Sequence, residues 1–424
     1  MRTYTNPIYL TKKVEEVKKE DITMPDKVPR DVVAVEPKKN EQTVHKMILS
    51  TDAINTIIKK VRREGIMKRA INFGIIGLGQ GGTRLAKEFE KLDYKVLAIN
   101  TSEQDLNESD CAERLLIGSG GAGRDLKIGS EAVNVKRPDI MSAYQRVFTN
   151  IDHAIVCAGS SGGTGGGGLI NIIDTLADYK VPVGVITTLP LNTEDTRSKR
   201  NTLAVLNELV KLNAAKKISP LIIIDNNKIE KKYPGLSTLE FWNKANEDVV
   251  KCFDLFNLLS SKSSAYTSLD PMDYRKILMS GGCMIFGNIT VAGEIAPTTI
   301  SEAIMTNINS GLLAEGFNLV EATTAGCIIA SNAEKLKVLP RAAEENAFGN
   351  LMRVLGSGTL FKGVYALNNI PDYEVFFMIS GLGLPASRIK ELIMSTKEES
   401  KHLDKKATTR TVDDIMKDLE SSAQ

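Results

Sequence analysis

Apolar residues in the first half of the chain follow two alternating spacings. Apolar runs at residues 71–76, 96–99 and 154–157 predict buried strands. Behind the first and third runs the apolar positions change to helical spacing, as in Leu85, Ala86 and Phe89 and in Leu169, Ile172, Ile173 and Leu176. Strands that alternate with helices predict an α/β fold, with a largely parallel sheet and helices on both faces.

A longer helix is predicted where apolar residues recur with helical spacing from Leu239 to Leu259. The chain has 424 residues, which leaves room for two domains and flanking tails. Its hydrophobic content of 42% is enough for a large core.

Both ends of the chain differ from this pattern. Residues 1 to about 50 are polar with mixed charge runs, and we expect them to be mostly disordered. Thr51 and Asp52 then cap a predicted helix with a basic far end. Its apolar face is formed by Ile54, Ile57, Ile58 and Val61. Basic amphipathic helices can bind membranes or nucleic acid, but more often they pack on their own domain, as we expect here.

A short apolar stripe lies near the C-terminus. It is formed by Val412, Ile415, Met416 and Leu419, behind the basic residues Lys405, Lys406 and Arg410. An isolated helix this short is marginal in water, so we expect it to fold onto a partner. A frayed tail is the alternative.

Composition favours a soluble, cytoplasmic protein. Five Cys residues lack C-x-x-C spacing, which predicts buried free thiols and no zinc site, and three separated His residues argue against a His-based metal site or triad. No apolar run reaches about 18 residues, and no signal peptide opens the chain. The formal net charge of +2 implies no strong direct attraction to nucleic acid.

A glycine-rich stretch, residues 158–168, lies between the third predicted strand and its helix. Segments of this kind direct successive backbone N–H groups toward an anion, and the positive helix N-terminus adds to the attraction. Glycine is needed there because a Cβ would block close approach or positive φ angles. A flexible linker can have the same composition, but linkers are not held between a buried strand and an amphipathic helix.

A second glycine turn, residues 77–82, matches the dinucleotide pattern G-x-G-x-x-G. That pattern requires an acidic residue at the end of the second strand, but the strand ends in Asn100, Thr101 and Ser102. The Walker pattern G-x-x-x-x-G-K-[ST] is also absent, because no Lys follows any of the glycine loops. We therefore expect a nucleotide that is held mainly by backbone amides.

Residues 161–167, S-G-G-T-G-G-G, resemble the signature G-G-G-T-G-[ST]-G of the tubulin/FtsZ superfamily, with Ser161 and Gly166 as departures. The resemblance covers roughly residues 70 to 395. Five further segments follow the order of the family's nucleotide loops: residues 77–82 (first phosphate loop), 100–101 (second), 118–123 (third), 190–194 (fifth) and 224–228 (sixth).

The resemblance implies a site for GTP or GDP with Mg²⁺. In it, Asn100 and Thr101 would lie near the nucleotide or Mg²⁺, Glu194 would contact the ribose, and Asn226 would bind guanine or ribose. The implied nucleotide-binding residues of the loops are Gly79, Gln80, Gly81, Asn100, Thr101, Gly120, Gly121, Ser161, Gly162, Gly163, Thr164, Gly165, Gly166, Glu194 and Asn226. The family's Arg, four residues after the ribose Glu, is replaced by Ser198, with Arg197 and Arg200 close by.

The start of the long helix would recognise the base. In the family an aromatic ring stacks on guanine there, and an amide or carboxylate one turn later contacts the base edge. Trp242 and Asn246 have the i, i+4 spacing that places both on one helix face. Phe241 is the alternative stacking ring, and Trp242 as a core residue is the simpler interpretation.

Residues 268–273, S-L-D-P-M-D, resemble the family's catalytic loop N-x-D-x-x-D, with Ser268 in place of Asn. The resemblance implies that Asp270 and Asp273 reach the nucleotide of a neighbouring subunit and orient the attacking water. Two Asp residues beside a Pro more often cap a helix, but the phosphate loops upstream favour the catalytic interpretation.

Within the superfamily we favour the plasmid and phage branch (TubZ-like proteins), because residues 376–385 and a helix from Ser387 resemble its last strand and final helix. The implied domains are an N-terminal extension (1–67), a GTP-binding domain (68–238), a central helix (239–262), a C-terminal activation domain (263–396) and a C-terminal tail (397–424).

The implied function is that of a GTPase whose subunits polymerise head to tail and segregate or position plasmid or phage DNA, with a DNA-binding adaptor on the tail. A cell-division role is the alternative within the family. Outside it, a dinucleotide-dependent oxidoreductase remains open. A non-hydrolysing nucleotide-binding scaffold also remains, supported only by Ser268 and Gly166.

Overall fold

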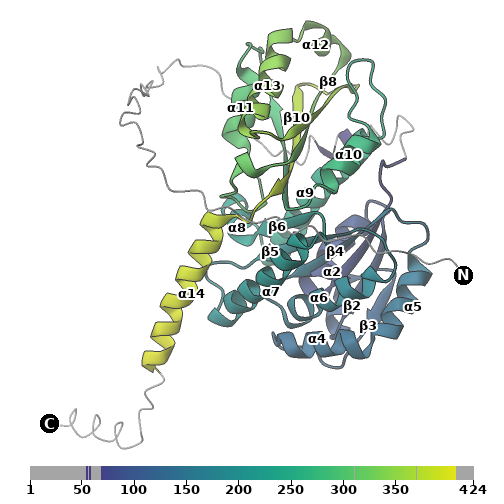
Figure 1. The fold of residues 1–424 in the computed structure, drawn as a ribbon, viewed down its shortest axis with the longest axis vertical. Coiled ribbons are helices and arrows are strands. Elements are labelled where there is room, and N and C mark those ends of the chain that lie inside the picture. Colours follow the sequence, from purple (N-terminus) through teal and green to yellow (C-terminus); the bar gives the residue numbers. More distant parts are fainter. Residues whose placement is uncertain (1–53, 56, 59–67, 310, 369, 407–424) are drawn as a thin grey trace, which may run out of the picture. The chain divides into compact units, whose positions relative to one another are not determined.

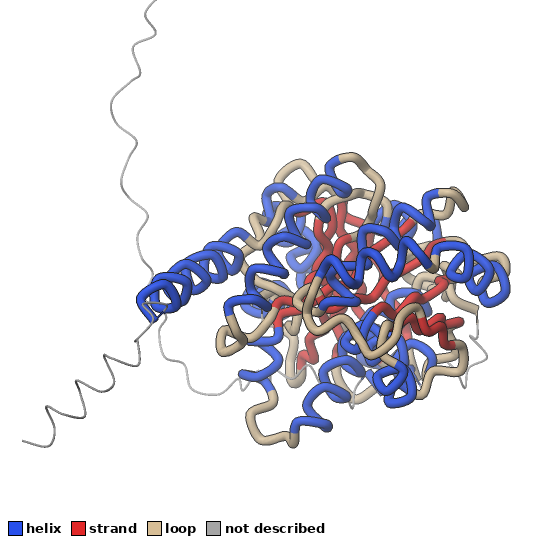
Figure 2. Tube along the Cα trace, turned by 90° about the horizontal axis from the view of Figure 1, so that it is seen from below, coloured by secondary structure: helices blue, strands red, loops and turns tan. Residues whose placement is uncertain are grey.

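Ten strands form one sheet in the computed structural model, which describes residues 54–55, 57–58, 68–309, 311–368 and 370–406 (Figure 1). The strand order is β3-β2-β1-β4-β5-β6-β7-β10-β8-β9. Figure 2 shows these strands enclosed between helices. The structure therefore confirms the α/β architecture, and the sheet is parallel in its first part and mixed in its second.

The first part of the sheet is entirely parallel and contains the predicted strands. Its strands are β1 (Phe73–Leu78), β2 (Lys95–Asn100), β3 (Arg114–Leu116), β4 (His153–Gly159), β5 (Val183–Leu189) and β6 (Leu221–Asp225). The helices that connect them are α2 (Gly79–Glu90), α3 (Glu103–Ser109), α4 (Leu126–Val135), α5 (Arg137–Val147), α6 (Gly163–Ala177), α7 (Thr196–Ala214) and α8 (Asn226–Lys232). Both glycine-rich helices, α2 and α6, begin inside the glycine runs that the sequence assigned to loops.

The second part of the sheet joins the first through the single pair Leu221–Cys283. Its strands are β7 (Cys283–Val291), β8 (Thr324–Ser331), β9 (Thr359–Ala366) and β10 (Tyr373–Leu382), with β10 antiparallel to both β7 and β8. Its helices are α10 (Pro271–Leu278), α11 (Thr299–Asn307), α12 (Ala333–Val338), α13 (Arg341–Val354), α14 (Ala386–Lys406) and the short 3₁₀ helix Leu319–Glu321.

Helix α9 (Thr238–Leu259) packs against both parts of the sheet. Its Phe253 ring contacts Phe73 of β1 at 5.2 Å and Phe286 of β7 at 5.9 Å between centroids. The sequence predicted this helix from its apolar spacing, and a capping box formed by Ser237 and Glu240 fixes its start. One rigid helix thus joins the nucleotide-loop strands to the C-terminal strands.

The N-terminal helix is described only at residues 54–55 and 57–58. There Ile54, Ile57 and Ile58 are buried, as expected for a helix that packs on its own chain. Val61 and most of the basic far end lie outside the described residues, and so does the C-terminal stripe from Val412 to Leu419. Helix α14 begins at Ala386, close to the predicted Ser387, and continues to Lys406 through the first residues of the predicted tail.

All five Cys side chains are buried and free, which confirms the prediction of buried thiols. Burial raises the pKa of Cys252 and Cys327 to about 12 each. Across the described segments, no cluster of three or more His, Cys, Asp or Glu side chains is arranged to hold a metal ion. None of the described helices combines the length and apolar character needed to cross a membrane.

Glu374 is a buried carboxyl group in β10, with only 2% of its surface exposed. The Thr290 hydroxyl lies 2.9 and 3.0 Å from its two oxygens. Burial raises the pKa of Glu374 from 4.5 to about 8, and the hydrogen bond from Thr290 only partly opposes this rise. The folded chain therefore retains a proton on Glu374 at pH values where the unfolded chain has lost it.

Stability is expected to fall as pH rises from about 4.5 to about 8, because folding favours the protonated form of Glu374 in that window. Glu374→Gln should remove this dependence and raise the free energy of unfolding at pH 8.5 by on the order of 2 kcal/mol. Denaturant unfolding at pH 5 and pH 8.5 measures the effect, with Glu334→Gln on the surface of α12 as the control. Equal pH dependence in Glu374→Gln and the wild type would show that Glu374 is ionised in the folded protein.

Candidate functional site

Each of the six parallel strands β1 to β6 leads directly into one segment that the sequence assigns to nucleotide binding. Neighbouring strands run in the same direction, so their carboxyl ends meet at one edge of the sheet. In open α/β sheets this edge is where ligands bind. The fold therefore gathers six segments, spread from residue 77 to residue 228, at one place.

The first turn and the long glycine run are in direct contact. Gly79 has a φ of 68°, and a Cβ on it would lie 2.7 Å from the backbone nitrogen of Gly165. A Cβ on Gly165 would lie 2.7 Å from the carbonyl oxygen of Gly159. Only glycine fits at these two positions. Gly81 is less constrained, since its nearest neighbour would lie 3.8 Å away.

Two further loops are tied to this contact by hydrogen bonds, one of them between two buried side chains. The hydroxyl groups of Thr101 and Thr164 lie 2.6 Å apart, and both residues are buried. The amide of Gly121 donates to the Thr101 carbonyl at 3.1 Å, which attaches the third loop. Gln80 donates to Asp105 at 3.1 Å, and buried Asn100 donates to the same carboxylate at 3.3 Å. Gly120 and Gly121 both have positive φ angles, which glycine adopts without strain.

The first turn of α6 presents free backbone donors at the centre of these loops. Gly162 is the N-cap residue and supplies no side-chain hydrogen bond, so the amides of Gly163, Thr164 and Gly165 have no intrahelical acceptor. These amides and the helix dipole attract an anion such as a phosphate group. The amide of Gly166, by contrast, donates to the Gly162 carbonyl at 2.9 Å and is already used by the helix.

The remaining glycines of this run serve helix packing, which the sequence did not reveal. A Cβ on Gly167 would lie 2.1 Å from the carbonyl oxygen of Leu126, and one on Gly168 would lie 2.7 Å from Val133. Both neighbours belong to α4, and a Cβ on Gly129 of that helix would lie 2.0 Å from the Gly163 carbonyl oxygen. The glycine run therefore combines free backbone amides at its start with close packing of α4 on α6 beyond it.

Asn226, at the start of α8, has a buried hydrogen-bond acceptor. The residue is 7% exposed, and its side-chain oxygen is buried without a hydrogen-bond partner in the described part of the chain. Buried acceptors are nearly always paired, so this oxygen fits a donor group on a base or a ribose. Glu194, the predicted ribose contact, lies on the neighbouring loop and accepts a hydrogen bond from the Leu191 amide at 3.0 Å.

Several arginines lie around the fifth loop. Arg124 pairs with Asp195, and Arg197 lies 3.4 Å from Asp125, so these pairs hold the third loop against the start of α7. Asn201 attaches the glycine run to the same helix by donating to the Ser161 carbonyl at 3.0 Å. A third arginine, Arg388, reaches the loop from α14, and no sequence pattern pointed to it.

Trp242 and Asn246 share one face of α9 with Phe253, which packs on Phe73 of β1. Phe253 also packs on Phe286 of β7, so this face of α9 is the one that lies against the sheet. Trp242 meets Phe241 edge-on, with centroids 4.8 Å apart and an angle of 87° between the rings. Phe241 also packs against the hydrophobic core, whereas Trp242 is half-buried.

Asp270 and Asp273 form the cap of α10, as the simpler interpretation of their sequence predicted. Asp270 accepts hydrogen bonds from the amides of Met272 and Asp273 at 2.8 and 2.9 Å, and Asp273 in turn accepts one from the Asp270 amide at 3.4 Å. The Asp270 bonds use one of its carboxylate oxygens, so capping leaves the second oxygen for another role.

Helix α10 lies at the opposite edge of the sheet from the phosphate loops. Its Arg275 is 3.5 Å from Asp152, which immediately precedes β4, and Ser219, just before β6, donates to the Leu278 carbonyl at 2.6 Å. The amino ends of the parallel strands therefore lie beside α10. Strands of five to seven residues separate the two edges by roughly 20 Å, so Asp270 and Asp273 do not reach the loops of their own subunit.

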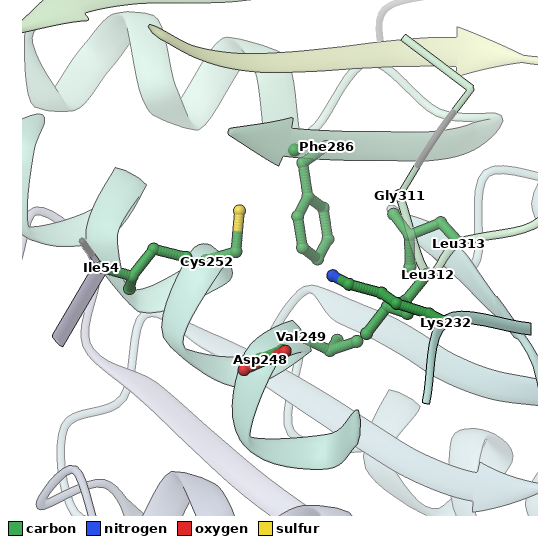
Figure 3. A pocket seen from close by; sticks show the side chains of 10 residues that line it. Ile54, Lys232, Asp248, Val249, Cys252, Phe286, Gly311, Leu312 and Leu313 are labelled. Atoms are coloured by element: carbon green, nitrogen blue, oxygen red, sulfur yellow. The ribbon is translucent and has the colours of Figure 1, made fainter. Parts of the chain in front are cut away.

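A small cavity between α9 and β7 is distinct from the nucleotide loops (Figure 3). The Lys232 amine points into it and has no hydrogen-bond partner among the described residues. Burial lowers the pKa of Lys232 to about 8, although Asp248 opposes the shift. The cavity volume of about 20 Å³ suits one water molecule and no larger ligand.

Two protein-family models match this chain. The GTPase domain of the Tubulin/FtsZ family matches residues 72–234, and the TubZ-like C-terminal domain matches residues 255–393. The first covers the strands whose loops form the candidate site, and the second covers the part of the sheet that carries α10.

Curated relatives come from bacteria and archaea. The tubulin-like protein TubZ of Bacillus cereus is 23% identical over 265 residues, which span 57% of this chain and only 60% of that protein. The tubulin-like protein CetZ of Pyrococcus furiosus is 27% identical over 338 residues, which span 76% of this chain and 88% of that protein.

Solved structures show the same fold. A GTPγS-form protofilament of TubZ from Bacillus thuringiensis serovar israelensis has a TM-score of 0.75 at 20% identity, covering 84% of this chain and 99% of that one. A GTPγS-bound protofilament of CetZ2 from Haloferax volcanii has a TM-score of 0.64 at 23% identity, covering 80% of this chain and all of that one.

Proposed function

Because this chain belongs to the tubulin/FtsZ family and carries its GTPase domain, we propose that it polymerises head to tail and hydrolyses GTP where two subunits meet. The similarity to TubZ and CetZ, and to a TubZ structure solved as a two-stranded filament, supports a role as a cytoskeletal filament protein. This membership removes the dinucleotide-dependent oxidoreductase as an alternative, in agreement with the lack of an acidic residue at the end of β2.

The observation that carries the nucleotide assignment is the first turn of α6. The amides of Gly163, Thr164 and Gly165 face the loops after β1 and β2, and they bind phosphate oxygens without a P-loop lysine. Thr101 and Thr164 supply hydroxyl oxygens beside them. Mg²⁺ commonly binds through phosphate oxygens, water and a few protein oxygens, so these residues fit a GTP·Mg²⁺ complex.

The base and ribose are assigned to the loops after β5 and β6 and to α9. Asn226 offers its unpaired oxygen, Trp242 its ring face and Asn246 an amide for the base edge. Glu194 lies on the ribose side.

Hydrolysis is assigned to the contact between subunits. Phosphoryl transfer to water needs positioning and charge stabilisation more than covalent chemistry. Asp270 and Asp273, at the edge opposite the phosphate loops, would orient water on the GTP of the next subunit. A single subunit would hold GTP but would have neither Asp beside it. GTP hydrolysis would therefore begin only when subunits assemble.

GTP and GDP are expected to bind, and ATP to compete poorly, because the amide of Asn246 matches the edge of guanine. Asn246→Ala should weaken GTP binding by about tenfold, the cost of leaving a buried base edge unpaired. Asn243→Ala, an exposed residue on another face of α9, is the control. Titration with GTP and ATP measures both effects, and equal affinity of the wild type for the two nucleotides would contradict the guanine assignment.

The cargo of the filaments is proposed to be plasmid or phage DNA. The match to the TubZ-like C-terminal domain supports this choice, and one structural neighbour is itself described as a type III plasmid segregation TubZ. A cell-division or CetZ-like cytoskeletal role is the alternative, since CetZ relatives match a larger share of the chain.

The C-terminal tail is proposed to bind a DNA-binding adaptor through its apolar stripe. Deleting residues 405–424 should leave GTP binding unchanged and abolish adaptor binding or alter filament stability. Filament pelleting measures filament stability, and an adaptor pull-down measures adaptor binding. A truncated protein that matches the full-length chain in both assays would contradict a role for the tail.

A further inference from the structure

Arg388 of α14 is buried, with 4% of its surface exposed, although most arginines lie at the surface. Its guanidinium donates from all three nitrogens: Nε to Asp225 at 2.9 Å, one terminal nitrogen to the Asn192 side chain at 2.9 Å, and the other to the Pro190 carbonyl at 3.0 Å. The rigid fork of one arginine therefore joins three groups on two separate loops.

The two loops held by Arg388 carry the proposed ribose and base contacts. Asp225 uses its other oxygen to cap α8, accepting from the Asn227 amide at 3.1 Å. The Asn227 side chain accepts from the Asn192 amide at 2.9 Å. Arg388 thus belongs to a closed network that fixes the start of α8, where the unpaired oxygen of Asn226 lies.

A second contact fastens the same loop to α14. Lys199 of α7 is fully buried and donates to the Asn192 carbonyl at 2.7 Å and to Ser395 of α14 at 2.9 Å, and it also pairs with Glu399. Thr196 donates to Glu399 at 2.9 Å. Helix α14 is therefore held to the fifth loop directly by Arg388 and, through Lys199, by Ser395 and Glu399, about two and three turns further along the helix.

We propose that Arg388 is a positioning residue for nucleotide binding, which sets the spacing between the ribose loop and the base loop and couples both to the docking of α14. This inference rests on the proposed function, because it places GTP between those loops. Arg388 touches no ligand in this arrangement and acts through Asp225 and Asn192. Coupling is reciprocal, so GTP that tightens the loops also tightens α14 on the body.

Arg388→Met and Arg388→Lys test the proposal, with Lys390→Met as a matched control on the exposed side of α14. Arg388→Met keeps most of the side-chain volume and should weaken GTP binding by about tenfold or more, since Asp225 loses its buried partner. Turnover at saturating GTP and a fixed, assembled protein concentration should change little, so the loss appears in KM. Arg388→Lys keeps the charge but not the fork, and its affinity should lie in between.

Amide hydrogen exchange over residues 386–399 distinguishes a positioning role of Arg388 from a merely structural one. In the wild type and in Lys390→Met, GTP should slow exchange in this segment. In Arg388→Met at saturating GTP the slowing should disappear.

If Arg388→Met does not fold, Arg388→Lys provides the same test. Wild-type GTP affinity in a folded Arg388 variant would overturn the proposal, as would exchange in wild-type α14 that GTP leaves unchanged. A wild-type chain that fails to bind GTP would instead sink the proposed function, and this inference with it.

Discussion

Asp270→Asn is expected to reduce GTP turnover by about 10²–10⁴-fold, the usual contribution of a positioned acid or base. GTP binding and polymerisation should persist, because Asp270 lies at the edge of the sheet opposite the phosphate loops. Filaments of this variant should live longer, since GDP would accumulate slowly in them. Turnover per subunit at a fixed, assembled concentration is the measurement.

The choice of Asn separates the two roles of Asp270. Asn is as good an N-cap as Asp, so the hydrogen bonds from the Met272 and Asp273 amides are retained while the charge is lost. Asp270→Ala should lose turnover equally and in addition lower the free energy of unfolding by about 1 kcal/mol. Wild-type turnover in Asp270→Asn would leave capping as the only role of this residue.

Gly79→Ala is expected to weaken GTP binding by about tenfold or more, because its positive φ and the approach to Gly165 both exclude a Cβ at a cost of about 1–3 kcal/mol. The added methyl group would push α6 away from the first turn and misplace the amides that face phosphate. Calorimetric titration with GTP measures the loss.

Gly349→Ala in α13 is the matched control, because nothing lies within 4 Å of a Cβ at that position. It should bind GTP like the wild type, with unchanged or slightly raised stability. Unimpaired GTP binding by a folded Gly79→Ala variant would show that the contact between Gly79 and Gly165 does not shape the site.

The sequence was sufficient to predict which segments lie together at one edge of the sheet, and physical reasons explain this. Apolar runs mark parallel strands, and parallel strands place all their carboxyl ends at one edge, so the segments at residues 77–82 and 161–167 had to meet. The contact between Gly79 and Gly165 and the bond between Thr101 and Thr164 are the result.

Other features depend on tertiary contacts that local patterns do not encode. Gly167 and Gly168 belong to the same glycine-rich sequence as the glycines proposed to bind phosphate, and only the position of α4 shows that they serve packing. Arg388 lies 163 residues from Asp225 in the sequence. Its helix contains many charged residues, and nothing in their pattern distinguishes Arg388 from the others.

The Asp270 and Asp273 pair shows a third kind of limit. Capping and catalysis were weighed as alternatives, yet a carboxylate has two oxygens, and the cap bonds of Asp270 use one of them. The structure confirms the cap. The catalytic role stays a prediction, because it requires a second subunit.

Mixing two impaired variants, at a GTP concentration that fills the wild type but not Gly79→Ala, tests the central claim, hydrolysis shared between subunits, most directly. Asp270→Asn keeps the phosphate loops and lacks the acid, whereas Gly79→Ala keeps the acid and is impaired in GTP binding. GTP turnover is measured for each variant alone and for an equimolar mixture at the same total concentration. The account predicts that the mixture turns over GTP well above the sum of the separate variants, because Asp270 of one subunit meets GTP on its neighbour. A mixture whose turnover only averages the two would place the acid and the nucleotide within one subunit and contradict the account.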